Sequence, residues 1–413
     1  MFRFLTAGES HGKGLTVIVE GLPAGIPVSE KYIAADMVRR MVGYGRGGRM
    51  KIERDFAEIL SGVRHGLTMG SPIAMWIENR DWSTGTGPDG VNWTDEMSID
   101  PTEVPYEKLT KLRPGHADTA GTIKYHQDDA RNILERSSAR ESAARVAAGS
   151  LAKRFLEEFD IEVHAHVTCI GGVHSNYSGE YNWDLLEESP FQQENPDGSK
   201  LAAVRCFDPE KAAEMIETID QARTNGDSAG GIIQIIATGL PIGLGTHIQW
   251  DQKITTKLAG AVMSINAVKG VEFGAGFDQA DLFGSQVHDV ILPRDQWENN
   301  TNIKGKGSWA RKTNNAGGVE GGMSNGEPVV INAIVKPIAT IINGLQTVDL
   351  HTGEFVDKAH FERSDITFVP TCAVIGEAMV ACVIAESMLE KFGGDHLEET
   401  KRNYHSYLDT IVP

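Results

Sequence analysis

The sequence predicts an α+β fold with two pseudo-equivalent halves. Two glycine-bracketed turns, at residues 8–12 and 226–230, each lead into a β-branched apolar run and then a Gly-Leu-Pro-X-Gly turn, and the matching glycines are 218 residues apart. A looser pair of turns, at residues 66–72 and 322–328, precedes two further apolar runs. Glycine turns that open β-branched runs are typical of strands. Helical patterns follow these strands in blocks, which indicates one layered body.

The individual elements follow in chain order. Apolar runs at 15–19, 73–77, 232–236 and 329–335 predict strands. Ser29 is a favourable N-cap for a helix that runs to Met41, and a second short helix is expected at about residues 253–264. Two long helices are predicted, from about 128 to 155 and from about 372 to 392, the latter ended by Gly393.

Three polar, turn-rich segments, at 81–105, 187–200 and 295–315, predict surface loops. We therefore expect a single domain over residues 1–413, with halves of about 1–160 and 220–392 and a polar tail at 395–413.

Composition excludes several classes of protein. Of the 413 residues, 40% are hydrophobic and 23% charged, as in ordinary globular proteins. The net charge of −18 disfavours a nonspecific nucleic-acid binder, which needs a basic face. The four cysteines show no CxxC spacing, so we expect neither a zinc site nor a disulfide framework, and a reducing cytoplasm fits. Glu377 and Glu386 interrupt the most apolar late segment, and we expect no membrane span.

Two familiar catalytic motifs occur in the wrong context. Residues 8–12 match GxSxG, but a nucleophile elbow needs a strand before the serine, whereas here the strand follows. Residues 43–48 match GxGxxG, but a helix precedes them where a dinucleotide fold needs a strand. P-loop and HExxH motifs are absent. His164 and His166 alternate on one predicted strand but have no third ligand, so no metal site is expected.

Arginines next to glycines predict a local cationic pocket in this acidic protein. Arg39, Arg40, Arg46 and Arg49 crowd one helix end and the glycine-rich loop after it. Guanidinium groups bind phosphate or carboxylate bidentately, and glycines let backbone N–H groups approach an anion. Further cationic residues precede the two long helices or lie near them: Arg113, Arg136, Arg140, Lys336 and Arg363. The alternative is a solvated basic turn.

Comparing matching positions of the repeat distinguishes residues that the turn needs for its structure from residues that could have a chemical role. Where the first turn carries His11, its counterpart carries Ala229, so the turn itself does not need an imidazole. His116 and Asp365 precede the two long helices, and these three residues could move protons on a polyanionic ligand. The pattern is compatible with three functions: an elimination enzyme, a phosphotransferase or phosphatase, and a non-catalytic anion-binding module. The missing P-loop and carboxylate metal cluster disfavour the second.

Five segments together identify a family resemblance. Residues 8–12, 45–49, 113–118, 135–141 and 315–326 resemble chorismate synthase, in the right order and within a match of roughly residues 1–392. The resemblance implies a β-α-β sandwich and a cytoplasmic homotetramer. It also implies a carbon–oxygen lyase that uses reduced FMN. That enzyme converts 5-enolpyruvylshikimate 3-phosphate to chorismate and phosphate by an anti-1,4-elimination without net redox change, the last step of the shikimate pathway. No flavin-reductase domain is appended, so an external flavin reductase, with NADPH as the reductant, would supply the cofactor.

The resemblance also assigns roles to residues. His11 matches a histidine near the leaving phosphate, His116 one that protonates reduced flavin, and Asp365 a carboxylate that assists deprotonation at C6. Ser10, Arg40, Arg46 and Arg49 match positions for substrate or NADP. The flavin contacts fall on Arg136, Ser137, Ser138, Asn266, Ala267, Gly321, Lys336, Pro337, Ile338, Ala339, Thr340 and Arg363.

The chain departs from the family pattern at three positions. Many members have histidine at Ser364, arginine at Thr371 and glutamine at Asn266. The change at Thr371 leaves one fewer positive charge near the site.

Overall fold

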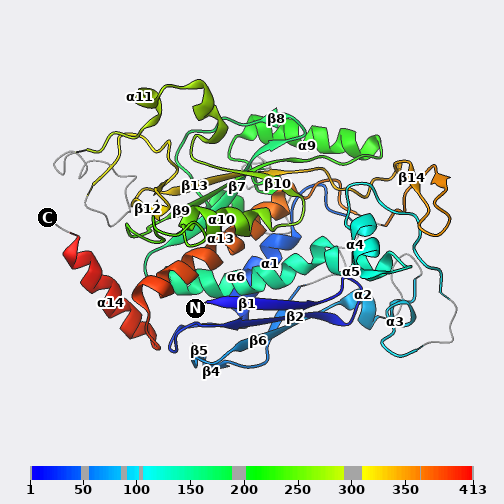
Figure 1. Cartoon of the computed structure of the whole chain (residues 1–413), viewed down its shortest axis with the longest axis horizontal. Coiled ribbons are helices and arrows are strands. Elements are labelled where there is room, and N and C mark those ends of the chain that lie inside the picture. Colours follow the sequence, from blue (N-terminus) through cyan, green and yellow to red (C-terminus); the bar gives the residue numbers. More distant parts are fainter. Residues whose placement is uncertain are drawn as a thin grey trace.

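Two β-sheets enclose a layer of helices (Figure 1). The computed structural model describes residues 2–47, 55–84, 91–101, 106–187, 201–292, 309–362 and 364–411. The arrangement is the β-α-β sandwich that the resemblance implies, so this prediction is confirmed.

The first sheet has the strand order β1-β2-β6-β3 and is antiparallel throughout. The bounds are Arg3–Gly8 for β1, Gly14–Glu20 for β2, Ile73–Glu78 for β6 and Ala57–Ile59 for β3. The second sheet has the order β10-β13-β9-β7-β8, also antiparallel. Its strands are β7 (Glu162–Ile170), β8 (Val173–His174), β9 (Gly231–Thr238), β10 (Val268–Phe273) and β13 (Val329–Val335). The four strands predicted from the repeat are therefore present as β2, β6, β9 and β13.

Three small hairpins complete the β structure. They pair β4 (Val63–Arg64) with β5 (Leu67–Thr68), β11 (Val319–Glu320) with β12 (Met323–Ser324), and β14 (Thr347–Val348) with β15 (Phe355–Val356).

Equivalent turns close both sheets with the same hydrogen bonds. The hydroxyl of Thr68 donates to the carbonyl of Pro23 at 2.6 Å and accepts the N–H of Ile26 at 2.9 Å. The hydroxyl of Ser324 makes the matching pair of hydrogen bonds. It donates to the carbonyl of Pro241 at 2.7 Å and accepts the N–H of Leu244 at 2.9 Å. In each sheet the strands that carry these turns, β2 with β6 and β9 with β13, are paired neighbours. The repeat in the sequence is therefore a repeat of turn chemistry.

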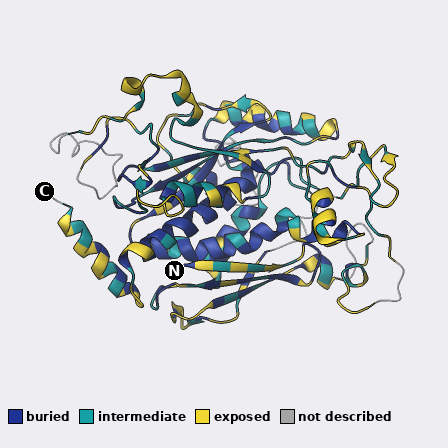
Figure 2. Cartoon of the chain, viewed as in Figure 1, coloured by how far each residue is buried: buried dark blue, intermediate teal, exposed yellow. Residues whose placement is uncertain are grey.

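Four helices fill the space between the sheets, and two of them, α6 and α13, are buried along most of their length (Figure 2). They are α1 (Glu30–Met41), α6 (Ser142–Glu157), α10 (Ile254–Met263) and α13 (Val369–Phe392). Helices α6 and α13 approach closely at Gly149, where an added Cβ would lie 2.3 Å from the Cβ of Ala378. Helix α13 is long and apolar enough to cross a membrane, but 94% of its most apolar window is buried in the fold, as expected of a core helix.

The predicted helix from 128 to 155 is wrong as a single element. The structure has α5 (Arg131–Ser137), a short 3₁₀ turn (Ala139–Glu141) and then α6. Ser138 is extended, with ψ of 146°, and its hydroxyl accepts the N–H of Arg140. A serine that bonds its own backbone in this way competes with the helix ladder. The break directs Ser137 and Ser138 into the candidate site. The other predicted helices match α1, which Ser29 caps, α10 and α13.

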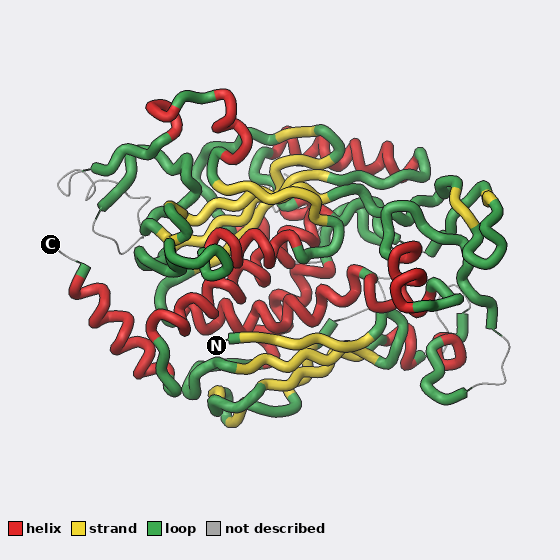
Figure 3. The backbone as a smooth tube through the Cα atoms, in the orientation of Figure 1, coloured by secondary structure: helices red, strands yellow, loops and turns green. Residues whose placement is uncertain are grey.

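Loops and short helices gather beyond the right-hand ends of the sheets in Figure 3. The short helices on that side are α2 (Arg80–Ser83), α3 (Trp93–Glu96) and α4 (Asp118–Tyr125). Helix α11 (Gly284–Val287) lies at the upper left of Figure 1. The remaining short elements are α7 (Asp184–Glu187), α8 (Leu201–Val204) and a 3₁₀ turn at Gly276–Asp281. Helix α9 (Pro209–Thr224) lies on the outer side of the second sheet. Within the three predicted loops, residues 85–90, 102–105, 188–200 and 295–308 lie outside the described part of the chain.

The polar tail contains a helix that the sequence analysis did not predict. Helix α14 (Leu397–Thr410) buries Tyr404 completely, and the hydroxyl of Tyr407 donates to the carbonyl of Ile242 at 3.0 Å. Polar composition hid this helix, because only one narrow face is buried.

Candidate active site

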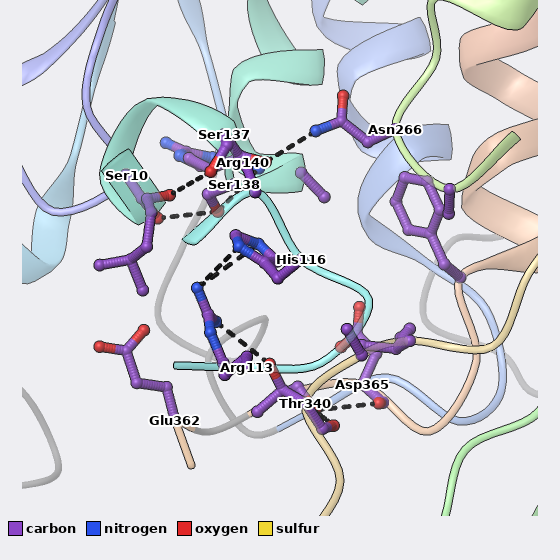
Figure 4. A pocket seen from close by; sticks show the side chains of 18 of the residues that line it. Ser10, Arg113, His116, Ser137, Ser138, Arg140, Asn266, Thr340, Glu362 and Asp365 are labelled. Carbon is purple, nitrogen blue, oxygen red and sulfur yellow. Dashed lines mark hydrogen bonds between the residues drawn. The ribbon is translucent and has the colours of Figure 1, made fainter. Parts of the chain in front are cut away.

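A cavity of about 430 Å³ opens where the loops before α6 and α13 meet the turn after β1 (Figure 4). Its volume is in the range of small-molecule sites. Most of the residues predicted for the site line it: Ser10, His11, Arg40, Arg46, His116, Ser137, Ser138, Asn266, Ala267, Lys336, Ile338, Ala339, Thr340 and Asp365. Both halves of the chain therefore contribute to one cavity.

Five predicted residues are not part of this lining. Arg136, Gly321 and Pro337 are described by the structure but lie outside the cavity wall, whereas Arg49 and Arg363 lie outside the described residues. The guanidinium of Arg136 instead donates to the main-chain carbonyls of residues 6 and 8.

Other residues line the cavity although the family resemblance assigned them no role. They include Trp93, Arg113, Leu134, Glu135, Arg140, Glu362, Ser364 and Phe368. Arg113, Glu135 and Arg140 lie within the segments that carry the resemblance, which was a usable signal. Trp93 stands in a polar loop, and nothing in its sequence surroundings indicates a buried position.

His11 is held by a carboxylate and an indole. Its Nδ1 lies 3.0 and 3.1 Å from the two carboxylate oxygens of Glu135, and its main-chain N–H donates to the same carboxylate at 2.8 Å. The ring stacks on Trp93 with centroids 3.8 Å apart and planes 9° apart. Burial opposes ionisation of Glu135, but the bond and charge of His11 keep the pKa of this carboxyl below its usual value.

His116 belongs to a second histidine–carboxylate pair. Its Nδ1 lies 2.5 Å from Oδ1 of Asp118, and the guanidinium of Arg113 donates to that carboxylate at 2.8 and 3.0 Å. Arg113 also donates to the hydroxyl of Thr340 at 3.2 Å, so it lies between His116 and Thr340 in Figure 4. Burial opposes ionisation of Asp118, but the hydrogen bonds from His116 and Arg113 hold its pKa well below the usual range.

One wall of the cavity carries two guanidinium groups. Arg40 and Arg140 both pair with the carboxylate of Asp55, and all three side chains are buried. Burial lowers the pKa of Arg40, while Asp55, despite its own burial, has a pKa well below its usual value because of the two guanidinium groups. Guanidinium groups in a cavity lining suit an anionic ligand.

Asp365 and Arg46 form an ion pair in the lining of the cavity. Nη1 of Arg46 is 2.5 Å from Oδ2 of Asp365, and the N–H of Gly47 donates to Oδ1 at 2.6 Å. The same Nη1 donates to the hydroxyl of Thr371 at 2.9 Å. This network joins the glycine-rich loop after α1 to the start of α13.

A further wall combines polar and apolar groups. The amide of Asn266 donates to the carbonyl of Ser137 at 2.8 Å, and the N–H of Lys336 donates to the carbonyl of Ala267 at 2.9 Å. Burial, with the nearby Lys269, lowers the pKa of Lys336. Ile338, Ala339, Leu134 and Phe368 supply apolar surface. Such a wall can bind a ligand that is partly polar and partly apolar.

Comparison with known proteins decides the family. A model of the chorismate synthase family matches residues 2–389. Chorismate synthase of Geobacter sulfurreducens is 49% identical over 413 residues, covering 100% of this chain and 99% of that protein. The chorismate synthase of Aquifex aeolicus is 49% identical over 414 residues, covering 99% and 98%. A solved structure described as the crystal structure of chorismate synthase is 40% identical and covers 99% of this chain and 98% of its own, with a TM-score of 0.73. The chain belongs to the chorismate synthase family.

Membership of the chorismate synthase family makes the chain a lyase of the last step of the shikimate pathway, which forms chorismate with reduced flavin. The cavity suits that chemistry because it combines anion-binding groups with two histidine–carboxylate pairs. Within the described residues, no group of three or more His, Cys, Asp or Glu side chains is arranged to hold a metal ion.

The departures from the chorismate synthase pattern have structural counterparts. Thr371, where many members have arginine, accepts the hydrogen bond from Arg46. Ser364, where many have histidine, donates its hydroxyl to the carbonyl of Thr340 at 2.9 Å. Asn266 reaches the carbonyl of Ser137 across the cavity (Figure 4).

Proposed function

We propose that this cavity binds reduced FMN and 5-enolpyruvylshikimate 3-phosphate together and eliminates phosphate to give chorismate. The C3–O bond and the C6–H bond break, a new C=C bond forms, and no net redox change occurs. The observation that carries this proposal is the convergence of four arginines and two histidine–carboxylate pairs on one cavity built from both halves.

The arginines would hold the anionic groups of the substrate. Arg40 and Arg46 are the described members of the cationic pocket that line the cavity, with Ser10 beside them. Arg113 and Arg140 add two guanidinium groups to the same lining. Arg49, assigned by the resemblance to substrate or NADP, would complete the set.

Three residues would handle protons. His11 would give a proton to the leaving phosphate, because it lies in the lining together with the cationic wall. His116 would hold a proton at the edge of the flavin and so keep it in its productive protonation state. Asp365 would take the proton that leaves C6, from the side of flavin N5.

The mixed wall would hold the flavin. When bound, reduced flavin supplies the electron that weakens the allylic C–O bond and recovers it at the end of the cycle. Among the assigned contacts, Ser137, Ser138, Asn266, Ala267, Lys336, Ile338, Ala339 and Thr340 line the cavity. Their hydroxyl, amide and ammonium groups match the polar edge and phosphate of FMN, and the apolar members match its ring. Arg136, Gly321, Pro337 and Arg363 complete the set that the resemblance assigns.

The setting of the enzyme belongs to the same proposal. We propose a single domain of two pseudo-equivalent halves, about 1–160 and 220–392, that acts in the cytoplasm as a homotetramer without nucleic acid or membrane. An external flavin reductase, with NADPH as the source of electrons, would reduce the FMN. Support for assembly comes from the first sheet, where Leu5 and Ile18 are cross-strand partners with exposed fractions of 72% and 41%. Such an exposed apolar strip is typical of a protein–protein contact.

The test is phosphate release in the presence of a chelator, with reduced FMN, oxidised FMN or no flavin. We expect release, with an equal amount of chorismate, only with reduced FMN. A phosphatase would release phosphate in all three samples, and an anion-binding module would release none.

A further inference from the structure

Glu135 holds the turn that carries His11 at three points. Its carboxylate accepts the main-chain N–H of His11 and lies 3.0 Å from Nδ1 of the ring, and its main-chain carbonyl accepts the N–H of Ser10 at 3.0 Å. The histidine backbone and its ring are therefore held by one residue of α5, from 124 positions further along the chain.

Glu135 is itself held in place. Nη1 of Arg131, one turn earlier on α5, donates to its Oε1 at 3.1 Å. The guanidinium of Arg131 lies 5.2 Å from the centre of the Trp93 ring, which stacks on His11. Glu135 and His11 have exposed fractions of only 3% and 9%, so both rotamers are set by packing.

The repeat provides an internal comparison. In the second half, the N–H of Ala229 donates to the carbonyl of Ile366 at 2.9 Å, which ties that turn to the segment before α13. A main-chain tie therefore occurs in both halves, but its donor is Ser10 in the first half and Ala229, the counterpart of His11, in the second. The accepting residue carries a carboxylate in the half with the imidazole, whereas in the second half it is the apolar Ile366. The carboxylate of Glu135 is therefore associated with the histidine and is not a general requirement of the turn.

We propose that Glu135 is the positioning residue for His11: it keeps a proton on Nδ1 and so assigns proton exchange with the ligand to Nε2. A histidine ring nitrogen that donates to a carboxylate has its tautomer and orientation set by that bond. In the proposed reaction, the Nε2–H bond breaks as an O–H bond forms on the leaving phosphate, and Nδ1–H remains with Glu135. The role in turnover rests on the proposed function, whereas the position of the proton does not.

The kinetic experiment is a double-mutant cycle of Glu135→Gln and His11→Gln. We expect Glu135→Gln to lower kcat on the order of 10- to 100-fold, the range found when a partner of a histidine is removed. KM and the affinity for oxidised FMN should each stay within about threefold, because a positioning effect acts on the reacting group alone. In the His11→Gln background, Glu135→Gln should cost nothing further. An undiminished cost in that background would overturn the proposal.

Two variants control the cycle. Glu158→Gln removes a carboxylate that pairs with Arg154 and Lys401 beyond the far end of α6, and its kcat should equal that of the wild type. Glu135→Asp keeps the charge and should recover part of the lost kcat. It also serves as the test variant if Glu135→Gln does not fold.

Nitrogen-15 NMR of histidine-labelled protein without ligands gives a readout independent of activity, with His11 assigned by its loss in His11→Gln. We expect a protonated Nδ1 in the wild type and a shift toward the Nε2–H tautomer in Glu135→Gln. An Nε2–H tautomer in the wild type overturns the inference. If the wild type releases no phosphate with reduced FMN, the proposed function fails, and the NMR result still decides the position of the proton.

Discussion

The guanidinium of Arg46 lies 2.5 Å from the carboxylate of Asp365, 319 positions away in the chain. The resemblance matches Arg46 to anion binding and Asp365 to proton transfer, and in the structure the two side chains pair with each other. The same carboxylate also accepts the N–H of Gly47, so each of its two oxygens already has a donor. We therefore expect a substrate anion to take over Arg46 and release Asp365.

Arg46→Ala should weaken substrate binding on the order of 10- to 100-fold, because charge-assisted hydrogen bonds contribute roughly 1.5–3 kcal/mol. Isothermal titration with substrate in the presence of oxidised FMN measures this. The matched control is Arg223→Ala, which removes an exposed arginine paired with Asp220 and should leave the isotherm unchanged. Wild-type affinity in Arg46→Ala would exclude the arginine from the substrate site.

His11→Ala should lower turnover on the order of 10²- to 10⁴-fold, the range for a lost general acid or base. The turn should survive, since Ala229 occupies the same position in the second half. Glu135 keeps Arg131 as a partner, and the loss of its bond to the ring should cost roughly 1–3 kcal/mol of unfolding free energy. Thermal unfolding checks the stability of the variant. A large decrease in the melting temperature would show that His11 is a structural residue.

His116→Ala and Asp365→Ala should each bind oxidised FMN with near wild-type affinity but fail to turn over. The fold around His116 should persist because Asp118 keeps both bonds to Arg113. Flavin fluorescence titration and anaerobic turnover with reduced FMN measure the two properties. Turnover at the wild-type rate in either variant would remove that residue from the mechanism.

The pH dependence of stability should show the buried His166. Burial lowers its pKa from 6.5 to about 4, while the ring nitrogen Nε2 remains bonded to Gln234. The unfolded chain therefore binds the proton more readily, so His166 favours the folded state above pH 6.5 and this contribution falls as the pH drops toward 4. At about 1.4 kcal/mol per pKa unit the loss is on the order of 3 kcal/mol. Melting curves of the wild type and His166→Gln between these pH values check this, and equal slopes would contradict it.

Much of the fold was predictable because its signals are local. Ser29 caps α1, Gly393 ends α13, and β-branched runs after glycine turns became β2, β6, β9 and β13. The break at Ser138 was not, since alanine-rich sequence on its C-terminal side favours a continuous helix and the competing bond is made by one hydroxyl.

The sequence indicated which residues line the candidate site better than it indicated how those residues contact one another. Fourteen of the residues that the resemblance assigned to the site line the cavity. The pairing of Arg46 with Asp365 and the stacking of Trp93 on His11 depend on distant chain segments, which no local pattern encodes. Arg136 is a residue that the resemblance assigned to the site but that does not line the cavity, because its guanidinium donates to main-chain carbonyls elsewhere.

Anaerobic single-turnover absorbance with reduced FMN and substrate distinguishes a flavin-dependent elimination without net redox change from every hydrolytic reaction. We expect that one equivalent of phosphate is released per site and that the flavin spectrum afterwards is that of the reduced form, with no oxidised flavin produced. Release of phosphate at the full rate with oxidised FMN, or without flavin, would contradict this expectation.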